Sequence, residues 1–128
     1  DFPSFLNFSF DSRDMMTVWF VGHPQLNRIL SRVPYEALQG RIHVRHQLQP
    51  INNKEQFTAL IQHGLSDAGC QQTLLSNSGI ELIRVASQGK PRLAHSLLTA
   101  ALRDAADQNM NHLSDEIIEQ AIRMLQGS

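Results

Sequence analysis

The first fifty residues contain two apolar runs with the spacing of β-strands. Met16–Val21 is a continuous apolar, β-branched and aromatic run that ends at Gly22, which is typical of a strand buried on both faces of a parallel sheet. Ile42–Leu48 alternates instead, and this alternation predicts two different faces. One face would carry Arg41, His43 and Arg45, and the other would carry Ile42, Val44, His46 and Leu48.

The residues between these runs predict two short helices. Pro24 can begin one through Leu30, and Pro34 can begin a second one through Leu38, because proline is favoured in the first helical turn. A strand, a helical crossover and another strand form a βαβ unit, so this part is expected to belong to a larger parallel sheet.

After Pro50 the apolar spacing changes to that of helices. The first of four predicted helices closes near Gly69, the second is capped by Ser76 or Asn77 and ends at Gly89, the third begins at Pro91, and the fourth is capped by Ser114. The predicted fold is therefore α/β followed by all-α. Residues 1–50 would contribute a partial parallel sheet of two strands, and residues 51–128 would form a four-helix subdomain hinged near Pro50.

Composition and charge narrow the function classes. The 128 residues are 41% hydrophobic and 18% charged, with a net charge of −1, so any attraction to nucleic acid would have to be local. The single cysteine, Cys70, excludes an internal disulfide and fits a cytoplasmic location. The apolar runs are much shorter than a membrane span, so no membrane contact is expected. Because the chain begins at Asp1 within a partly apolar segment, we expect a fragment of a longer protein.

The sequence disfavours three functions: metal binding, catalysis by a cysteine nucleophile and DNA recognition by a helix. His43 and His46 would face opposite sides of a strand, and the histidines of the helical part lie on separate elements, so no metal site is expected. Nothing in the sequence near Cys70 would activate it as a nucleophile. The third helix carries Arg92 and Arg103 among apolar and acidic residues, which argues against a DNA-recognition helix.

The stretch Gly89–Leu93 predicts a helix start that favours an anion. Gly89 permits a sharp entry, Pro91 is preorganised for the first helical position, and Arg92 adds a guanidinium to the free N–H groups. An ordinary helix cap is the alternative interpretation. His23 after the first predicted strand and Arg41 before the second are two further polar groups that, with Arg92, can surround one phosphate.

Four collinear stretches resemble the C-terminal half of an AAA+ ATPase, and within that superfamily the ExeA-type and transposition-helper ATPases related to MuB and TnsC. They are Leu6–Ser12, Val18–Leu26, Gly40–Pro50 and Gly89–Leu93. The resemblance implies that His23 occupies the sensor 1 position, where these relatives usually carry glutamine. It also implies that Arg41 is an arginine finger acting on a neighbouring subunit. Arg92 would be sensor 2 at the nucleotide, flanked by Gly89 and Pro91.

The resemblance implies that the chain is part of a longer protein. Residues 1–50 would be the end of the AAA+ α/β core, and residues 51–128 would be the helical lid. The chain contains no G-x-x-x-x-G-K-[ST] phosphate loop and no apolar strand ending in Asp-Glu, so it is expected to be inactive and to need no cofactor alone. ATP and magnesium would act in the parent protein.

The parent protein is expected to be a cytoplasmic homo-oligomer that uses ATP to drive assembly. Its partners would be a transposase and target DNA, or components of a secretion complex. The alternative is a self-standing helical module that binds a protein partner without using nucleotide. The upstream coding sequence would separate the two interpretations, since only the first requires a phosphate loop there.

Overall fold

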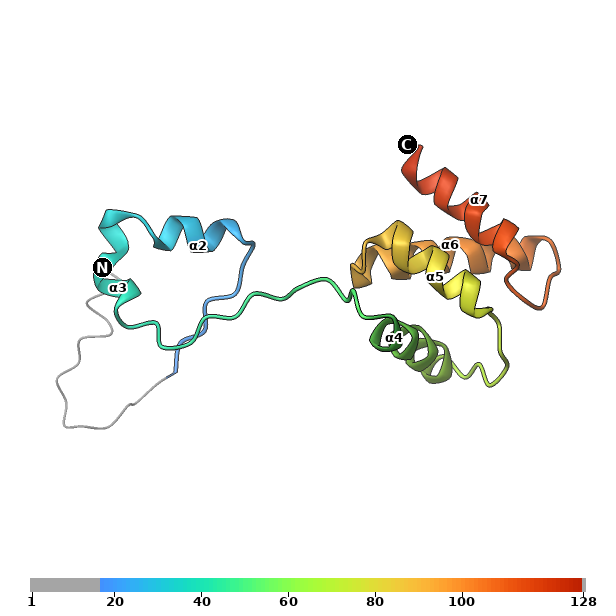
Figure 1. Cartoon of the computed structure of the whole chain (residues 1–128), viewed down its shortest axis with the longest axis horizontal. Coiled ribbons are helices and arrows are strands. Elements are labelled where there is room, and N and C mark those ends of the chain that lie inside the picture. Colours follow the sequence, from blue (N-terminus) through green and yellow to red (C-terminus); the bar gives the residue numbers. More distant parts are fainter. Residues whose placement is uncertain (1–16, 128) are drawn as a thin grey trace. The chain divides into compact units, whose positions relative to one another are not determined.

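The computed structural model describes residues 17–127, and the regular elements in this range are all helical (Figure 1). The chain divides into two compact units, Asp1–Leu48 and Gln49–Ser128, which are treated separately below. The stretch Leu6–Ser12 and the first residue of the first predicted strand, Met16, lie outside the described residues.

The first unit contains short helices at the positions predicted from the two prolines. They are α2 (Gln25–Leu30), the 3₁₀ helix η1 (Val33–Tyr35) and α3 (Glu36–Gln39). The side-chain amide of Gln39 donates a hydrogen bond to the carbonyl of Leu30, which ties the end of α3 to the end of α2. Leu38 is the only buried residue among the described residues of this unit.

The two predicted strands are wrong, and with them the α/β fold class. No strand occurs among residues 17–127, where an isolated parallel bridge between Leu75 and Leu113 is the only β-type pairing. Trp19 and Val21 are 83% and 89% exposed, and Val44 and Leu48 are 82% and 88% exposed. The predicted faces of the second strand are therefore not distinguished by burial.

The physical reason for this failure is that a strand depends on a neighbour. Apolar and alternating runs favour extended backbone, but a sheet forms only where a second strand supplies the matching N–H and C=O groups. The described part of the first unit contains no second strand beside residues 17–23 or 42–48, so both runs remain irregular.

The second unit confirms the four predicted helices. They are α4 (Lys54–Asp67), α5 (Asn77–Ser87), α6 (Pro91–Asp107) and α7 (Asp115–Gln126). Ser76 and Ser114 act as N-caps, accepting hydrogen bonds from the N–H groups of Gly79 and Ile117. Asn53, which sequence reasoning did not single out, caps α4 in the same way.

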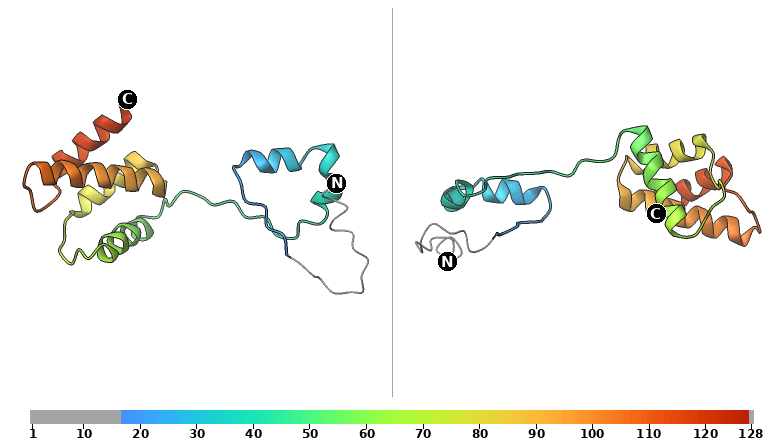
Figure 2. Two further views of the ribbon diagram at one scale, coloured as in Figure 1. Left: turned by 180° about the vertical axis from the view of Figure 1, so that it is seen from behind. Right: turned by 90° about the horizontal axis from the view of Figure 1, so that it is seen from below.

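The core of the second unit lies where α5, α6 and α7 meet, with α4 packed against α5 (Figures 1 and 2). Phe57 of α4, Ile83 of α5 and Ile118 of α7 have the largest fully buried apolar side chains. Each stabilises the fold by about 2 kcal/mol through removal of apolar surface from water. The loops before α5 and α7 are joined by a hydrogen bond of 2.8 Å from Leu113 N–H to the Leu74 carbonyl. This core fixes the turn between α5 and α6 and the start of α6, where Gly89, Pro91 and Arg92 lie.

Candidate functional site

The turn between α5 and α6 is closed by two residues with positive φ. Gln88 has φ 53° and Gly89 has φ 68°. The N–H of Gly89 donates to the carbonyl of Arg84 at 3.1 Å, and the N–H of Lys90 donates to the carbonyl of Ser87 at 3.0 Å. These bonds satisfy carbonyls at the end of α5 and set the direction in which α6 begins.

Gly89 is also required for packing. Its carbonyl accepts a 2.8 Å hydrogen bond from the N–H of Ile51. A Cβ placed on Gly89 would lie 2.5 Å from the Ile51 carbonyl oxygen, which is closer than real Cβ atoms come to a backbone oxygen. The glycine is therefore explained by a contact within the fold, independently of any ligand.

The first turn of α6 presents Arg92 to solvent. Lys90 is the N-cap in extended conformation and provides no side-chain cap, in contrast to the N-caps of α4, α5 and α7. Pro91 occupies the first helical position and Arg92, which is exposed, follows it. A helix start with uncapped N–H groups and an adjacent guanidinium can bind an anion such as a phosphate group.

The other two predicted site residues belong to the first unit. His23 is exposed and directly precedes Pro24 and α2, and its carbonyl accepts a 2.8 Å hydrogen bond from the N–H of Leu26. Arg41 is exposed and follows α3, and its N–H donates to the carbonyl of Leu38 at 3.0 Å. The segment α2–η1–α3 thus separates His23 from Arg41 along the chain, and their roles stay predictions.

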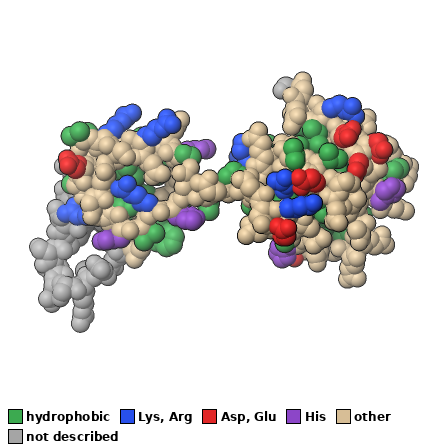
Figure 3. Space-filling view, viewed as in Figure 1, with side chains coloured by type: hydrophobic (Ala, Val, Ile, Leu, Met, Phe, Trp, Pro, Cys, Tyr) green, Lys and Arg blue, Asp and Glu red, His purple; other side chains and the backbone are tan. Residues whose placement is uncertain are grey.

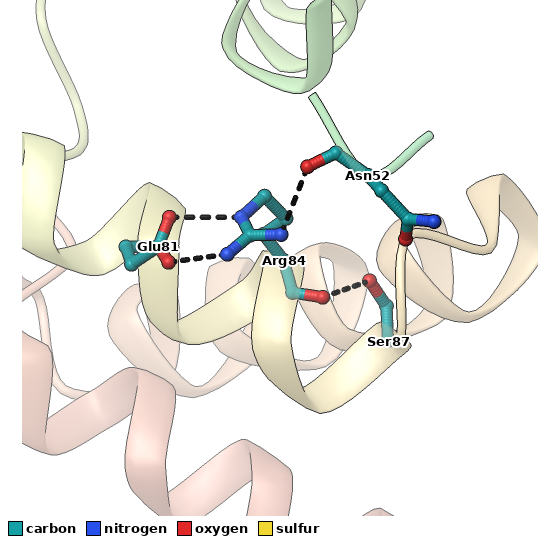
Figure 4. A network of polar contacts seen from close by, with 4 residues as sticks. All are labelled: Asn52, Glu81, Arg84 and Ser87. Atoms are coloured by element: carbon teal, nitrogen blue, oxygen red, sulfur yellow. Dashed lines mark hydrogen bonds and ion pairs between the residues drawn. The ribbon is translucent and has the colours of Figure 1, made fainter. Parts of the chain in front are cut away.

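Sequence reasoning missed a polar network centred on Arg84 of α5 (Figure 4). The guanidinium makes a bidentate pair with the Glu81 carboxylate, at 2.9 Å from Nε and 2.6 Å from Nη2. Its Nη1 donates to the carbonyl oxygen of Asn52 at 3.1 Å. The spacing of Glu81 and Arg84 could have indicated the ion pair, because residues three apart on a helix are neighbours. The contact to Asn52 left no signal in the sequence.

The Glu81–Arg84 pair predicts a pH dependence of stability. The hydrogen bond from Arg84 lowers the pKa of Glu81 below its usual value, and the same bond raises the pKa of Arg84. A carboxylate with a lowered pKa stabilises the fold above the pKa of the unfolded chain, and this contribution is lost as pH falls through the folded-state pKa.

We therefore expect Glu81→Gln to lower the thermal midpoint at neutral pH. The difference from the unsubstituted chain should shrink as pH falls below the ordinary glutamate pKa of about 4.3. Circular dichroism melts of the 128-residue chain from pH 7 to pH 3 measure this. Glu119→Gln, an exposed change on α7, is the matched control and should show no such convergence. A Glu81→Gln difference that is constant over the whole range would contradict the prediction.

A surface depression of about 470 Å³ lies at the other end of α6, between its last turns and the loops before α5 and α7. Leu74, Met110 and Leu113 contribute apolar lining. None of the predicted site residues borders it, so it does not extend the candidate site.

Charged groups are interspersed on the face of the helical unit shown in Figure 3. In the part of the chain that the structure describes, no group of three or more His, Cys, Asp or Glu side chains could hold a metal ion. Within the same part, every helix is too short or too polar to cross a bilayer.

The chain is similar to the general secretion pathway protein A of Aeromonas hydrophila. The two are 27% identical over 96 residues, which are 75% of this chain and 17% of that protein. The similarity supports a relationship of the ExeA type. No family model matches the chain, and no solved structure matches it.

Proposed function

We propose that this chain is part of an AAA+ ATPase of the ExeA type, with residues 51–128 as the helical lid and Arg92 as its contact to the nucleotide of the same subunit. The similarity to general secretion pathway protein A supports the relationship. The main support for a nucleotide contact is the start of α6. Arg92 is exposed there, in a first turn that has no side-chain cap. Phosphate oxygens are the ligands that this combination favours.

We assign three features to the longer protein: the phosphate loop, the magnesium site and ATP hydrolysis. Residues 17–127 offer a guanidinium and helix N–H groups for phosphate, and no carboxylate cluster for magnesium. In the longer protein, ATP would be bound between the phosphate loop and the lid. The position of the lid would therefore depend on which nucleotide is bound. Arg41 would reach the nucleotide of a neighbouring subunit, and this requires a homo-oligomer.

The biological step that we propose is assembly of a secretion complex, with secretion components as partners. The name of the similar protein, general secretion pathway protein A, favours this over transposition, in which a transposase and DNA would be the partners. His23 would take the sensor 1 position, where an imidazole can hydrogen-bond a phosphate or a water.

Arg92→Ala in the longer protein should weaken ATP binding or hydrolysis by about tenfold or more, because a hydrogen bond to a charged group contributes about 1.5–3 kcal/mol. Nucleotide affinity by fluorescence titration and steady-state turnover measure the effect. The fold should be unaffected, since the Arg92 side chain is exposed.

Arg103→Ala is the matched control for this variant. Arg103 is an exposed arginine on the same helix, three turns further on. It should leave both affinity and turnover unchanged. If Arg92→Ala behaves like Arg103→Ala, then Gly89–Leu93 is an ordinary helix start and the proposed role of the site is wrong.

A further inference from the structure

Two successive residues of the segment that leads into α4 are bonded to the α5–α6 turn and to the last turn of α5. Ile51 donates its N–H to the Gly89 carbonyl at 2.8 Å, and the Asn52 carbonyl accepts a 3.1 Å hydrogen bond from Arg84. The next residue, Asn53, accepts a 2.8 Å hydrogen bond from the first turn of α4. Each residue is thus held by a directional bond, so the backbone has little rotational freedom where it enters the helical unit.

Arg84 contacts both sides of this arrangement. Its side chain holds Asn52, while its carbonyl accepts hydrogen bonds from the Gly89 N–H at 3.1 Å and from the Ser87 hydroxyl at 3.2 Å (Figure 4). The bidentate pair with Glu81 fixes the plane of the guanidinium, which leaves Nη1 directed at the Asn52 carbonyl. One residue therefore links the incoming segment to the turn from which α6 starts.

The start of α6 follows this turn without a flexible joint. Gly89 is held by its N–H and its carbonyl, and Pro91 has a fixed φ, so the turn determines where the next residue, Arg92, is placed. We propose that Arg84 is a positioning residue, which holds Ile51 and Asn52 against the end of α5 and the α5–α6 turn and thereby sets the position of Arg92. This inference rests on the proposed function, in which Arg92 has a nucleotide to contact.

If Arg84 and Glu81 formed only an isolated surface ion pair, the loss of Arg84 would have different effects from those of a positioning residue. Exposed pairs contribute little to stability, and their loss changes nothing beyond the pair itself. The bond from Arg84 to the Asn52 carbonyl predicts instead a local effect at Ile51, the neighbouring residue. It also predicts an effect on turnover that is transmitted through Arg92.

The local effect can be measured in the 128-residue chain by amide hydrogen exchange. Arg84→Ala should accelerate exchange of the Ile51 amide by about tenfold, while the amide of Ile83 in the core of α5 stays protected. Arg103→Ala should leave both unchanged. Unchanged exchange at Ile51 would overturn the proposal, because it would show that Arg84 does not hold this segment. Equal acceleration at Ile51 and Ile83 would also overturn it, because it would show only a loss of global stability.

The transmitted effect can be measured in the longer protein by ATP turnover. Arg84→Ala should lower kcat by about tenfold, because small misplacements of a binding group have effects of this size or larger. Combined with Arg92→Ala it should lower kcat no further, since Arg84 acts through Arg92. Arg84→Lys, which keeps a charged donor, should recover part of the loss.

The outcomes separate this inference from the proposed function. If Arg92→Ala lowers turnover and Arg84→Ala does not, or if their effects multiply, Arg84 does not position Arg92, although the proposed function stands. If Arg92→Ala has no effect on affinity or turnover, the proposed function fails and positioning of a nucleotide contact fails with it. In that case the exchange rate of the Ile51 amide still decides whether Arg84 holds the segment that leads into α4.

Discussion

Gly89→Ala should lower the thermal midpoint of the 128-residue chain by about 15 °C, from a loss of about 3 kcal/mol in the free energy of unfolding. Two effects combine at this position. The φ of 68° costs an alanine about 1–2 kcal/mol. The new Cβ would also stand 2.5 Å from the Ile51 carbonyl oxygen, so Ile51 must move and weaken its hydrogen bond to residue 89.

Two other glycines provide matched controls for the separate effects. Gly69 has φ 83° but no atom within 4 Å of a new Cβ, so Gly69→Ala should cost only the conformational term of about 1 kcal/mol. Gly64 lies within α4 with open space around it, and Gly64→Ala should stabilise the helix by about 0.5–1 kcal/mol. If Gly89→Ala melts at the same temperature as Gly69→Ala, the close approach of Ile51 does not exist in solution.

This expected loss of stability affects how a functional defect at Gly89 is interpreted. A Gly89 variant of the longer protein would have a less stable helical unit, whether or not its backbone contacts nucleotide. Arg92 is the better probe, because its exposed side chain can be removed without disturbing the core. We therefore base the test of the nucleotide contact on Arg92 and the test of the packing on Gly89.

The helices of the second unit could be predicted because their signals are local. Ser76, Pro91 and Ser114 mark helix starts within a few residues of the apolar stripes that they precede, and these starts are confirmed. Asn53 caps α4 by the same local rule, although it was not predicted from the sequence. Local patterns were sufficient for four helices and for the short helices of the first unit.

The strands could not be predicted reliably, because their existence depends on partners elsewhere. Trp19 and Val44 lie in runs with strand-like composition, yet the described residues contain no second strand for either. The same limit applies to the candidate site. Gly89 and Ile51 are far apart in the sequence, as are Arg84 and Asn52, so neither contact follows from spacing. The exposed position of Arg92 at a helix start was predictable, because helix period and proline placement determine it.

The largest functional effect is expected from Arg41→Ala in the longer protein. An arginine acting in trans stabilises charge that develops on the nucleotide of the neighbouring subunit, and its removal can lower the rate by about 10³–10⁵-fold. Nucleotide affinity should be preserved, because the residue acts on the transition state and not on the ground state. Turnover and affinity are measured on the same preparation. Arg28→Ala, at an exposed arginine of α2, is the matched control and should leave both unchanged.

Mixing subunits distinguishes action in trans from action within one subunit. Arg41→Ala subunits would keep the phosphate loop that we propose for the longer protein, and subunits with a disabled loop would keep Arg41. Neither preparation alone should therefore turn over ATP. In a mixed oligomer, Arg41 of one subunit can serve the nucleotide bound to the other, and part of the activity should return. If mixed oligomers form but remain inactive, Arg41 does not act across a subunit boundary. If Arg41→Ala turns over normally, Arg45 is the next arginine along the chain to test in the same way.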